Sequence, residues 1–343
     1  MHGARIIEGD YNLAEEAHRP VQAVSCLPPG KQAALCFSID DIHPGKSTDA
    51  YEAGGDLGDG ALGQLEWLLA RHPKLRVTLF VTADWREISP RPTRKLLASI
   101  PYVRDRVYLA KRLPKGTMRL DRHPGFVRYL KSLDRAEIGL HGLYHCQKGP
   151  RIPVEFQTGS YAETRVALER MMGVFRQAGL DLVRGLCPPG WNAPPALMAA
   201  LADLGIKFIA SARDGITPVS PGAKTCNSGM RGVSLVYPEM VHGGALVHLP
   251  ANSQANCPID RARAILDCGG LLSIKAHIVK TAFGHTSCDG LDDTYIHYLD
   301  VLLTKLDELY GDAVWWTSMS EIADHLHARH KLLPDLCTAS GPS

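Results

Sequence analysis

Short apolar runs of strand length alternate with longer helical patterns along most of this chain. Apolar runs of four to eight residues between turn residues are typical of buried strands, and apolar residues spaced three or four apart are typical of helices. About seven or eight such strand–helix units occur in 343 residues, with no internal repeat. The pattern favours a parallel sheet covered by helices, either an α/β barrel or a doubly wound sheet.

The predicted strands cover residues 33–39, 76–81, 136–141, 182–186, 207–210, 233–237, 245–249, 271–277 and 313–316. The predicted helices cover residues 61–71, 125–133, 161–178, 194–204, 259–267, 293–309 and 318–327. Residues 85–124, rich in Pro, Arg and Lys, are interpreted as an excursion with short helices, and the tail after residue 331 as frayed. We expect a single catalytic domain over residues 1–343, with its core at about 33–328.

The composition is that of a globular protein, with 45% hydrophobic and 22% charged residues. A net charge of +2 without a Lys/Arg block argues against nucleic acid or an anionic membrane as partner. No apolar stretch reaches the roughly 18 residues of a membrane span, and the first residues lack a signal-peptide core. Nine scattered Cys without a CxxC pair suit reduced thiols. We therefore expect a cytoplasmic protein; the composition leaves its oligomeric state open.

Two adjacent carboxylates, Asp40 and Asp41, end the first predicted strand. Burying a carboxylate costs free energy unless a metal, a cation or several donors compensate it. Side chains alternate along a strand, so the two would point to different sides unless the strand ends there. At a strand end they can serve one site, one as a metal ligand and one as a base. Alternatively, the pair caps a following turn or helix.

Two histidines, His141 and His145, follow the predicted strand at 136–141. If this segment opens as a helical turn, the four-residue spacing puts both imidazoles on one face. Together with Asp41 they would form the two-His, one-carboxylate set that zinc and iron(II) use. Iron oxygenases with such a set typically have a jelly roll, which the alternating pattern does not suggest. Two structural histidines are the alternative.

Two further segments follow predicted strands. In CPPGWNAP at 187–194, Pro189 belongs to a rigid loop, and Trp191 offers a flat apolar face to a sugar or other ring. A turn with a core Trp is the alternative. His277 ends LLSIKAH, where it is well placed as a general acid. A core histidine is the alternative, and His248 is a weaker rival for the same role.

The loop after the aspartate pair is unusually polar and begins with His43. Together with Trp85 and Arg86, this loop is predicted to wall the site and contact substrate hydroxyls or a charged group. A solvated surface loop explains the same residues equally well.

The four segments, in this order, resemble the motifs of the polysaccharide deacetylase superfamily, the NodB-homology enzymes of carbohydrate esterase family 4. The family's TFDDG reads SIDDI at 38–42, and its H-S/T-x-x-H reads HGLYH at 141–145. Its R-x-P with a nearby aromatic is matched by CPPGW at 187–191, and its last His by AHI at 276–278. WWTSMSEIADHL at 315–326 also looks like the family's closing strand and helix. The resemblance spans roughly residues 35–326.

The resemblance implies a distorted (β/α) barrel of about seven strands that holds a divalent metal, usually zinc. The metal ligands would be Asp41, His141 and His145. Asp40 would be the base and His277 the acid in the removal of an N-acetyl group from an amino sugar or amino-sugar conjugate. The resemblance also implies that the oxyanion is held by the metal and by a backbone N–H near Trp191.

Three positions depart from the family pattern. Cys187 stands where the family commonly has an Arg that orients the base, and Arg184 is a candidate substitute. Gly142 replaces the Ser or Thr of the second motif, and Ile42 replaces the Gly after the aspartate pair. These changes suggest an intracellular branch acting on a small or carrier-linked amino-sugar substrate. The alternatives are hydrolysis of another amide or ester, such as a formamido sugar, and a carbohydrate-binding pseudoenzyme.

Overall fold

Parallel strands form the centre of the structure, as the apolar runs predict. The computed structural model describes residues 27–47, 54–86, 95–104, 112–146, 155–157, 159–191, 193–211, 230, 233–255, 257–278, 281–282, 285–286 and 290–338. Within these residues nine strands form one sheet in the order β11-β1-β2-β3-β4-β5-β7-β6, with β8 also paired to β1. The strands are β1 (Ala33–Ile42), β2 (Val77–Val81), β3 (Ala136–Leu140), β4 (Gly185–Leu186), β5 (Phe208–Ile209), β6 (Glu239–Val241), β7 (Leu246–His248), β8 (Leu271–His277) and β11 (Val314–Trp316). A separate hairpin joins β9 (Thr281–Ala282) to β10 (His285–Thr286).

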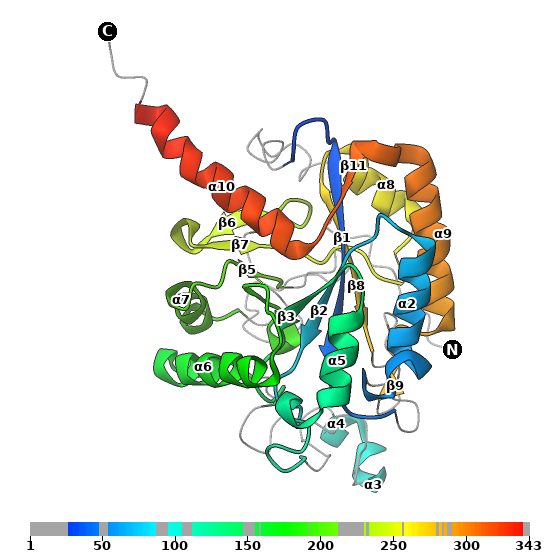
Figure 1. Cartoon of the computed structure of the whole chain (residues 1–343), viewed down its shortest axis with the longest axis vertical. Helices are drawn as coiled ribbons and strands as arrows, with labels where there is room; N and C mark the ends of the chain where they lie inside the picture. The colour runs from blue at the N-terminus through cyan, green and yellow to red at the C-terminus, as the bar shows by residue number, and fades with distance from the viewer. Residues whose placement is uncertain are drawn as a thin grey trace.

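Helices surround these strands (Figure 1). The longer ones cover the outside of the sheet, and two short helices, α3 and α4, lie in the excursion after β2. The helices are α2 (Ala61–Arg71), α3 (Lys95–Ala98), α4 (Pro101–Arg104), α5 (Pro124–Ser132), α6 (Tyr161–Ala178), α7 (Pro195–Asp203), α8 (Ile259–Asp267), α9 (Asp293–Tyr310) and α10 (Met319–Thr338). None of the described helices combines the length and the apolar character needed to cross a membrane.

The sheet curves until its two ends meet without a continuous ladder. β8 pairs with β1 along most of its length, whereas β11 and β2 pair with successive parts of β1. At the far end, the segment after β7 reaches β8 through an isolated bridge between Ser253 and Ile274. The buried Asn252 side chain reinforces this junction, because it donates to the carbonyls of Leu235 and Leu271 and accepts from the N–H of Ser273. The distorted (β/α) barrel predicted from the resemblance is confirmed.

Alternating residues of β1 separate two apolar layers. Leu35, Phe37 and Ile39 belong to a large cluster shared with the helices. Ala34 and Cys36 belong to a smaller cluster formed by residues from strands around the barrel and from helix α10. Both sets are fully or almost fully buried, so β1 has no solvent face. The even-numbered residues of β1 therefore point into the barrel, and the next inward position after Ser38 is Asp40.

Most predicted elements are confirmed, several to the residue: α2, α6, α8 and β8 have the expected bounds. The strand predicted at 233–237 is wrong. The Ser234 hydroxyl accepts from the N–H groups of Val236 and Tyr237, which forms a turn, and the strand begins instead at Glu239. The last helix also continues to Thr338 rather than ending at residue 327. Parts of the predicted excursion, residues 87–94 and 105–111, lie outside the described residues.

Candidate metal centre and catalytic site

Both aspartates of the pair face the barrel interior because β1 contains a bulge. The pairing of β1 with β2 shifts register between Ile39 and Ile42, and Asp41 has a φ of 63°. A bulge places one extra residue against the partner strand, so two consecutive side chains can share a side. Ile42 then returns to the outer apolar layer. In a regular strand, alternation would point Asp40 and Asp41 to opposite sides. The bulge removes this separation inside β1, so the strand does not have to end at the pair.

Asp41, His141 and His145 form a group that can hold a metal ion, since one ligand atom from each lies within 4.8 Å of the others. Asp41 Oδ1 is 3.0 Å from His141 Nε2 and 3.0 Å from His145 Nε2. The four-residue spacing predicted that a helical turn would bring the two imidazoles together, but the structure has no helical turn there. Instead, residues 141–146 are irregular, with positive φ at Gly142 and His145. Burial would raise the pKa of Asp41, but the two histidines hold it well below its usual range.

The donor chemistry of this group fits a divalent metal. His141 Nδ1 donates to the carbonyl oxygen of Cys187 at 2.8 Å, which leaves the lone pair of a neutral ring on Nε2. That lone pair would face Asp41 Oδ1 at 3.0 Å, and two acceptors so close require a cation or a proton between them. A backbone carbonyl that accepts from the other ring nitrogen in this way is typical of metal-ligating histidines.

A buried glutamate supports the loop that carries the two histidines. Glu155 Oε2 accepts from the N–H groups of Tyr144 and His145, each at 3.1 Å. Burial raises the pKa of Glu155 to about 7, against the opposing effect of these N–H donors. A Cβ on Gly142 would lie 2.4 Å from Glu155 Oε2 and 2.9 Å from Pro189 Cγ. Gly142 therefore leaves the space in which Glu155 supports the loop, at the position where the family motif has a hydroxyl.

Asp40 lies beside the ligand group but has different partners. Its Oδ2 accepts from Lys275 Nζ at 2.5 Å, from Cys187 Sγ at 3.2 Å and from Trp191 Nε1 at 3.2 Å. Its Oδ1 is buried and has no hydrogen-bond partner among the described residues. Burial would raise the pKa of Asp40, but Lys275, together with His141 and His277, lowers it below its usual value.

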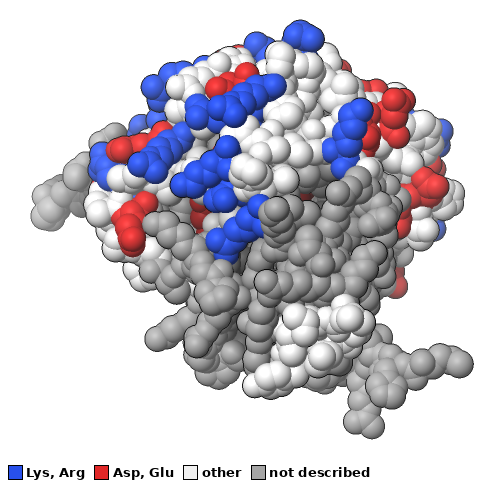
Figure 2. Space-filling view, turned by 90° about the horizontal axis from the view of Figure 1, so that it is seen from below, with Lys and Arg blue, Asp and Glu red and all other residues white. Residues whose placement is uncertain are grey.

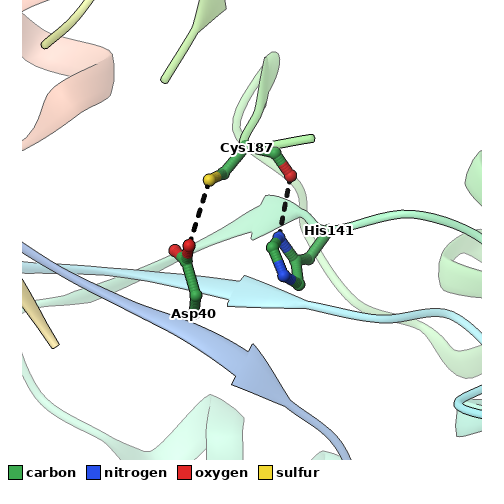
Figure 3. A group of neighbouring side chains, drawn as sticks. All are labelled: Asp40, His141 and Cys187. Atoms are coloured by element: carbon green, nitrogen blue, oxygen red, sulfur yellow. Dashed lines mark hydrogen bonds between the residues drawn. The ribbon is translucent and has the colours of Figure 1, made fainter. Parts of the chain in front are cut away.

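Asp40, His141 and Cys187 form a second cluster of possible ligand types, drawn in Figure 3. Its contacts argue against a metal there. The Cys187 thiol donates to Asp40, and burial next to that carboxylate raises the pKa of the thiol well above its usual value. The dashed lines in Figure 3 show that Cys187 instead links the other two side chains, through its thiol on one side and its carbonyl on the other.

His277 lies next to Asp40 because of strand register. The two residues are Cα partners in the β1–β8 ladder, and His277 Nε2 is 3.9 Å from Asp40 Oδ2. The rings of Trp191 and His277 pack in a T-shaped arrangement with their centroids 5.7 Å apart. The rival His248 is fully buried, and its Nε2 lies 3.2 Å from the carbonyl oxygen of Ser211.

Three of the residues predicted to contact substrate, His43, Trp85 and Arg86, pack against neighbouring protein groups. Trp85 is buried between two imidazoles, with ring centroids 4.2 Å from His43 and 4.5 Å from His145. Burial lowers the pKa of His43 to about 3, and its Nδ1 accepts from the N–H of Gly45. Arg86 Nε donates to a backbone carbonyl, and its guanidinium lies 5.3 Å from the centre of the Tyr144 ring. Contact of these residues with substrate stays a prediction.

Pro189 and Trp191 lie at the same end of the barrel as the aspartates. A short 3-10 turn, Pro189–Trp191, carries both residues. The backbone N–H of Trp191 donates to the carbonyl of Pro188 at 2.7 Å. That N–H is therefore already paired and is not a free donor for an oxyanion. One ring face of Trp191 receives Lys275 Nζ, 4.2 Å from the ring centre.

Lys275 was not among the site residues predicted from the sequence. Arg184, the candidate substitute for the motif Arg, donates to the carbonyl of Gly205, and the cation beside Asp40 is Lys275. A signal was available in the strand LLSIKAH. Lys275 precedes His277 by two residues, so both side chains point to the same side of β8. A lysine inside a buried strand, in phase with a candidate catalytic histidine, indicates a buried counter-charge.

Comparison with known proteins agrees with this architecture. No protein-family model and no curated protein matches the chain. Among solved structures, one described as a putative polysaccharide deacetylase from Mycobacterium smegmatis matches with a TM-score of 0.54 and 19% identity, over 89% of this chain and 93% of that one. A probable polysaccharide deacetylase from Pseudomonas aeruginosa PAO1 matches with a TM-score of 0.54 and 14% identity, over 93% and 98%. The chain has the polysaccharide deacetylase fold.

The PuuE allantoinase structure matches with a TM-score of 0.56 and 14% identity, over 93% of this chain and 97% of that one.

Figure 2 shows the end of the molecule toward which β1 points. On its described surface, Lys and Arg side chains gather on one side, with Asp and Glu side chains among them.

Proposed function

We propose that this protein is a metal-dependent hydrolase that removes an N-acetyl group from an amino sugar or an amino-sugar conjugate. The observation that carries the proposal is the pair of 3.0 Å contacts from Asp41 Oδ1 to the two imidazoles, with Asp40 and His277 beside them. The fold supports the same class of reaction, because two similar structures carry the name polysaccharide deacetylase.

Asp41, His141 and His145 would hold the divalent metal, with zinc as the ion that this donor set favours. A metal bound there supplies Lewis-acid polarisation of an acyl oxygen and makes a bound water more acidic. Three protein ligands leave coordination positions open for water and substrate, which distinguishes a catalytic site from a structural one.

Asp40 would act as the base through Oδ1. This oxygen is buried and has no described partner, whereas Oδ2 accepts three hydrogen bonds. A base with one free oxygen can accept a proton from an attacking water without breaking the contacts that hold it. The carboxylate is ionised at neutral pH, because its pKa is lowered from an already acidic value.

His277 would act as the acid. An amide nitrogen leaves poorly unless it gains a proton as the C–N bond breaks, and an imidazolium can supply one near neutral pH. Register places His277 opposite Asp40, so the acid and the base come from neighbouring strands. Trp191 packs against the His277 ring and limits its orientations.

The decisive measurement is hydrolysis of a panel of amides: acetate release from N-acetylated amino sugars and their carrier-linked conjugates, formate release from formamido sugars, and ring opening of allantoin. We expect zinc-loaded protein to act on an N-acetylated sugar and to lose activity with a chelator. Asp40→Ala should lower kcat by about 100-fold or more while the metal stays bound. His141→Ala should lose the metal itself.

Asp324→Ala is the matched control, because Asp324 is an exposed carboxylate paired with Lys207 outside the site. Its activity should equal that of the wild type. Metal-loaded wild type that is inactive on every amide and ester would contradict the proposal and favour a carbohydrate-binding pseudoenzyme. Activity confined to allantoin or another non-sugar amide would assign the second candidate, a hydrolase of a different amide.

A further inference from the structure

Lys275 is a buried cation inside the barrel. Its residue is 4% exposed, and its Nζ lies 2.5 Å from Asp40 Oδ2. Removing an ammonium group from water costs several kcal/mol, and the cost is offset only by a well-placed partner with further hydrogen bonds. The ion pair with Asp40 meets this condition at the centre of the candidate site.

The strand backbone around Lys275 is held on both sides. Its N–H donates to the carbonyl of Ser253 at 2.9 Å, and its carbonyl accepts from the Tyr295 hydroxyl at 2.5 Å. The ammonium group also lies 4.2 Å from the ring centre of Trp191, within cation–π range. Lys275 therefore projects from a strand whose backbone is held on both sides, and its Nζ packs against the Trp191 ring.

This arrangement divides the work of the Asp40 carboxylate between its two oxygens. Oδ2 accepts from Lys275, Cys187 and Trp191, which together fix the rotation of the carboxylate. Oδ1 remains buried with no described partner. Loss of the shortest of these three contacts, that of Lys275, would leave Oδ2 with hydrogen bonds from two neutral donors and allow the carboxylate to turn.

We propose that Lys275 is the positioning residue for the base: its ammonium group holds Asp40 Oδ2 so that Oδ1 faces the reacting water. This inference rests on the proposed function for the role of Asp40, but the ion pair itself can be tested without any substrate. Lys275 does not touch the reacting atoms in this scheme, so its effect should fall on kcat rather than on substrate binding.

The first test uses Lys275→Ala with the best substrate from the acetate-release panel. We expect kcat to fall by about 100-fold, with KM and zinc stoichiometry unchanged, because a misplaced base costs rate and not binding. Ethylammonium should restore activity in a saturable manner. Tetramethylammonium has the same charge but no N–H, so it should not restore activity.

Lys207→Ala is the matched control. Lys207 makes an equally short contact with Asp324, but both side chains are about half exposed. Its kcat should equal that of the wild type with or without added amine. Unchanged kcat in Lys275→Ala would overturn the inference. Equal rescue by ethylammonium and tetramethylammonium would also overturn the inference, and so would a rise in KM without a change in kcat. Neither result requires an oriented hydrogen bond.

The second test is a double-mutant cycle on thermal unfolding of Lys275→Met, Asp40→Asn and the double variant. Each single change leaves a buried polar group without its partner, so we expect Tm to fall by about 5 °C or more in each. The double variant should lose much less than the sum. The same cycle on Lys207 and Asp324 should show no coupling.

The two tests separate failure of the inference from failure of the proposed function. Strong coupling between Lys275 and Asp40, together with a wild type that is inactive on every substrate, would confirm the ion pair but reject the hydrolase assignment. Asp40 would then not be a base, and the positioning role of Lys275 would be rejected with it. An active wild type with no coupling between Lys275 and Asp40 would reject the inference alone.

Discussion

At the scale of single residues, the adjacent carboxylates Asp40 and Asp41 differ because their neighbours differ. Asp41 faces two imidazoles, whereas Asp40 faces an ammonium group, a thiol and an indole N–H. Both carboxylates have a lowered pKa despite burial. Their partners therefore separate a candidate metal ligand from a candidate base more clearly than their positions in the sequence do.

His43 should make the protein sensitive to acid. Its pKa in the folded protein is about 3, below the ordinary value of 6.5, so its contribution to stability is present above pH 6.5 and is lost as the pH falls toward 3. The loss from this one group amounts to about 1.4 kcal/mol per pH unit in that window. His43→Phe keeps a ring against Trp85 but cannot gain a proton.

We expect urea unfolding of chelator-treated protein to show a shallower loss of stability for His43→Phe than for wild type between pH 6.5 and pH 4. The variant can be less stable at pH 7, because the acceptor for the Gly45 N–H is lost. The slope is therefore the readout. Parallel curves for the two proteins would mean that His43 does not carry the acid sensitivity.

At the scale of elements, two irregular segments aim the site. The bulge in β1 turns Asp41 inward, and the loop after β3 turns His145 toward it. Asp41, His145 and Trp191 all have positive φ values, of 63°, 55° and 58°. Backbone strain of this kind costs of order 1–3 kcal/mol per residue and is typical of functional sites.

The loop after β3 should not tolerate a side chain at Gly142. Gly142→Ala combines a φ of 86° with a Cβ 2.4 Å from Glu155 Oε2, so it should displace the glutamate that holds the N–H of His145. We expect zinc affinity to fall by about 10-fold to 100-fold, as for loss of other supports of metal ligands. Zinc titration of the purified variant measures this directly.

Gly179→Ala is the matched control for this change. Gly179 ends α6 with a φ of 69°, but a Cβ there would meet nothing within 4 Å. It should therefore cost about 1 kcal/mol of stability from backbone strain and leave zinc affinity unchanged. Equal zinc affinities for the two variants would show that Glu155 does not support the metal site.

At the scale of the whole molecule, the candidate site depends on the junction that brings the sheet ends together. Lys275 and His277 come from β8, which is placed by its ladder to β1 and by the bridge to the segment after β7. The Asn252 side chain makes three hydrogen bonds across this junction and is fully buried. It holds the barrel wall where no continuous ladder does.

Asn252→Leu should therefore destabilise the protein strongly. The new side chain has a similar size but leaves two carbonyls and one N–H without their partner, so we expect unfolding free energy to fall by about 3 kcal/mol or more. Ser160→Ala, which removes the capping box of α6, should cost only about 1 kcal/mol. Urea unfolding of both variants gives the comparison, and an equal cost would contradict a special role for the junction.

The sequence by itself determined the elements and the class of fold. Strand and helix periodicity placed α2, α6, α8 and β8, because local spacing of apolar residues reflects which face is buried. The order of short motifs at strand ends also predicted which side chains would meet. The failure at residues 233–237 has a local cause, since one serine hydroxyl captured two N–H groups that a strand would have used.

Only the tertiary structure decided how the site is built. The bulge that puts Asp40 and Asp41 on one side, the Glu155 support at Gly142 and the Lys275 ion pair all join residues distant in sequence or alter a strand's regular alternation. Periodicity cannot report these contacts, because each depends on the register between strands and on the space between side chains. The sequence therefore predicts the candidate chemistry, whereas the pairing of Lys275 with Asp40 and the orientation of the Asp40 carboxylate depend on tertiary packing.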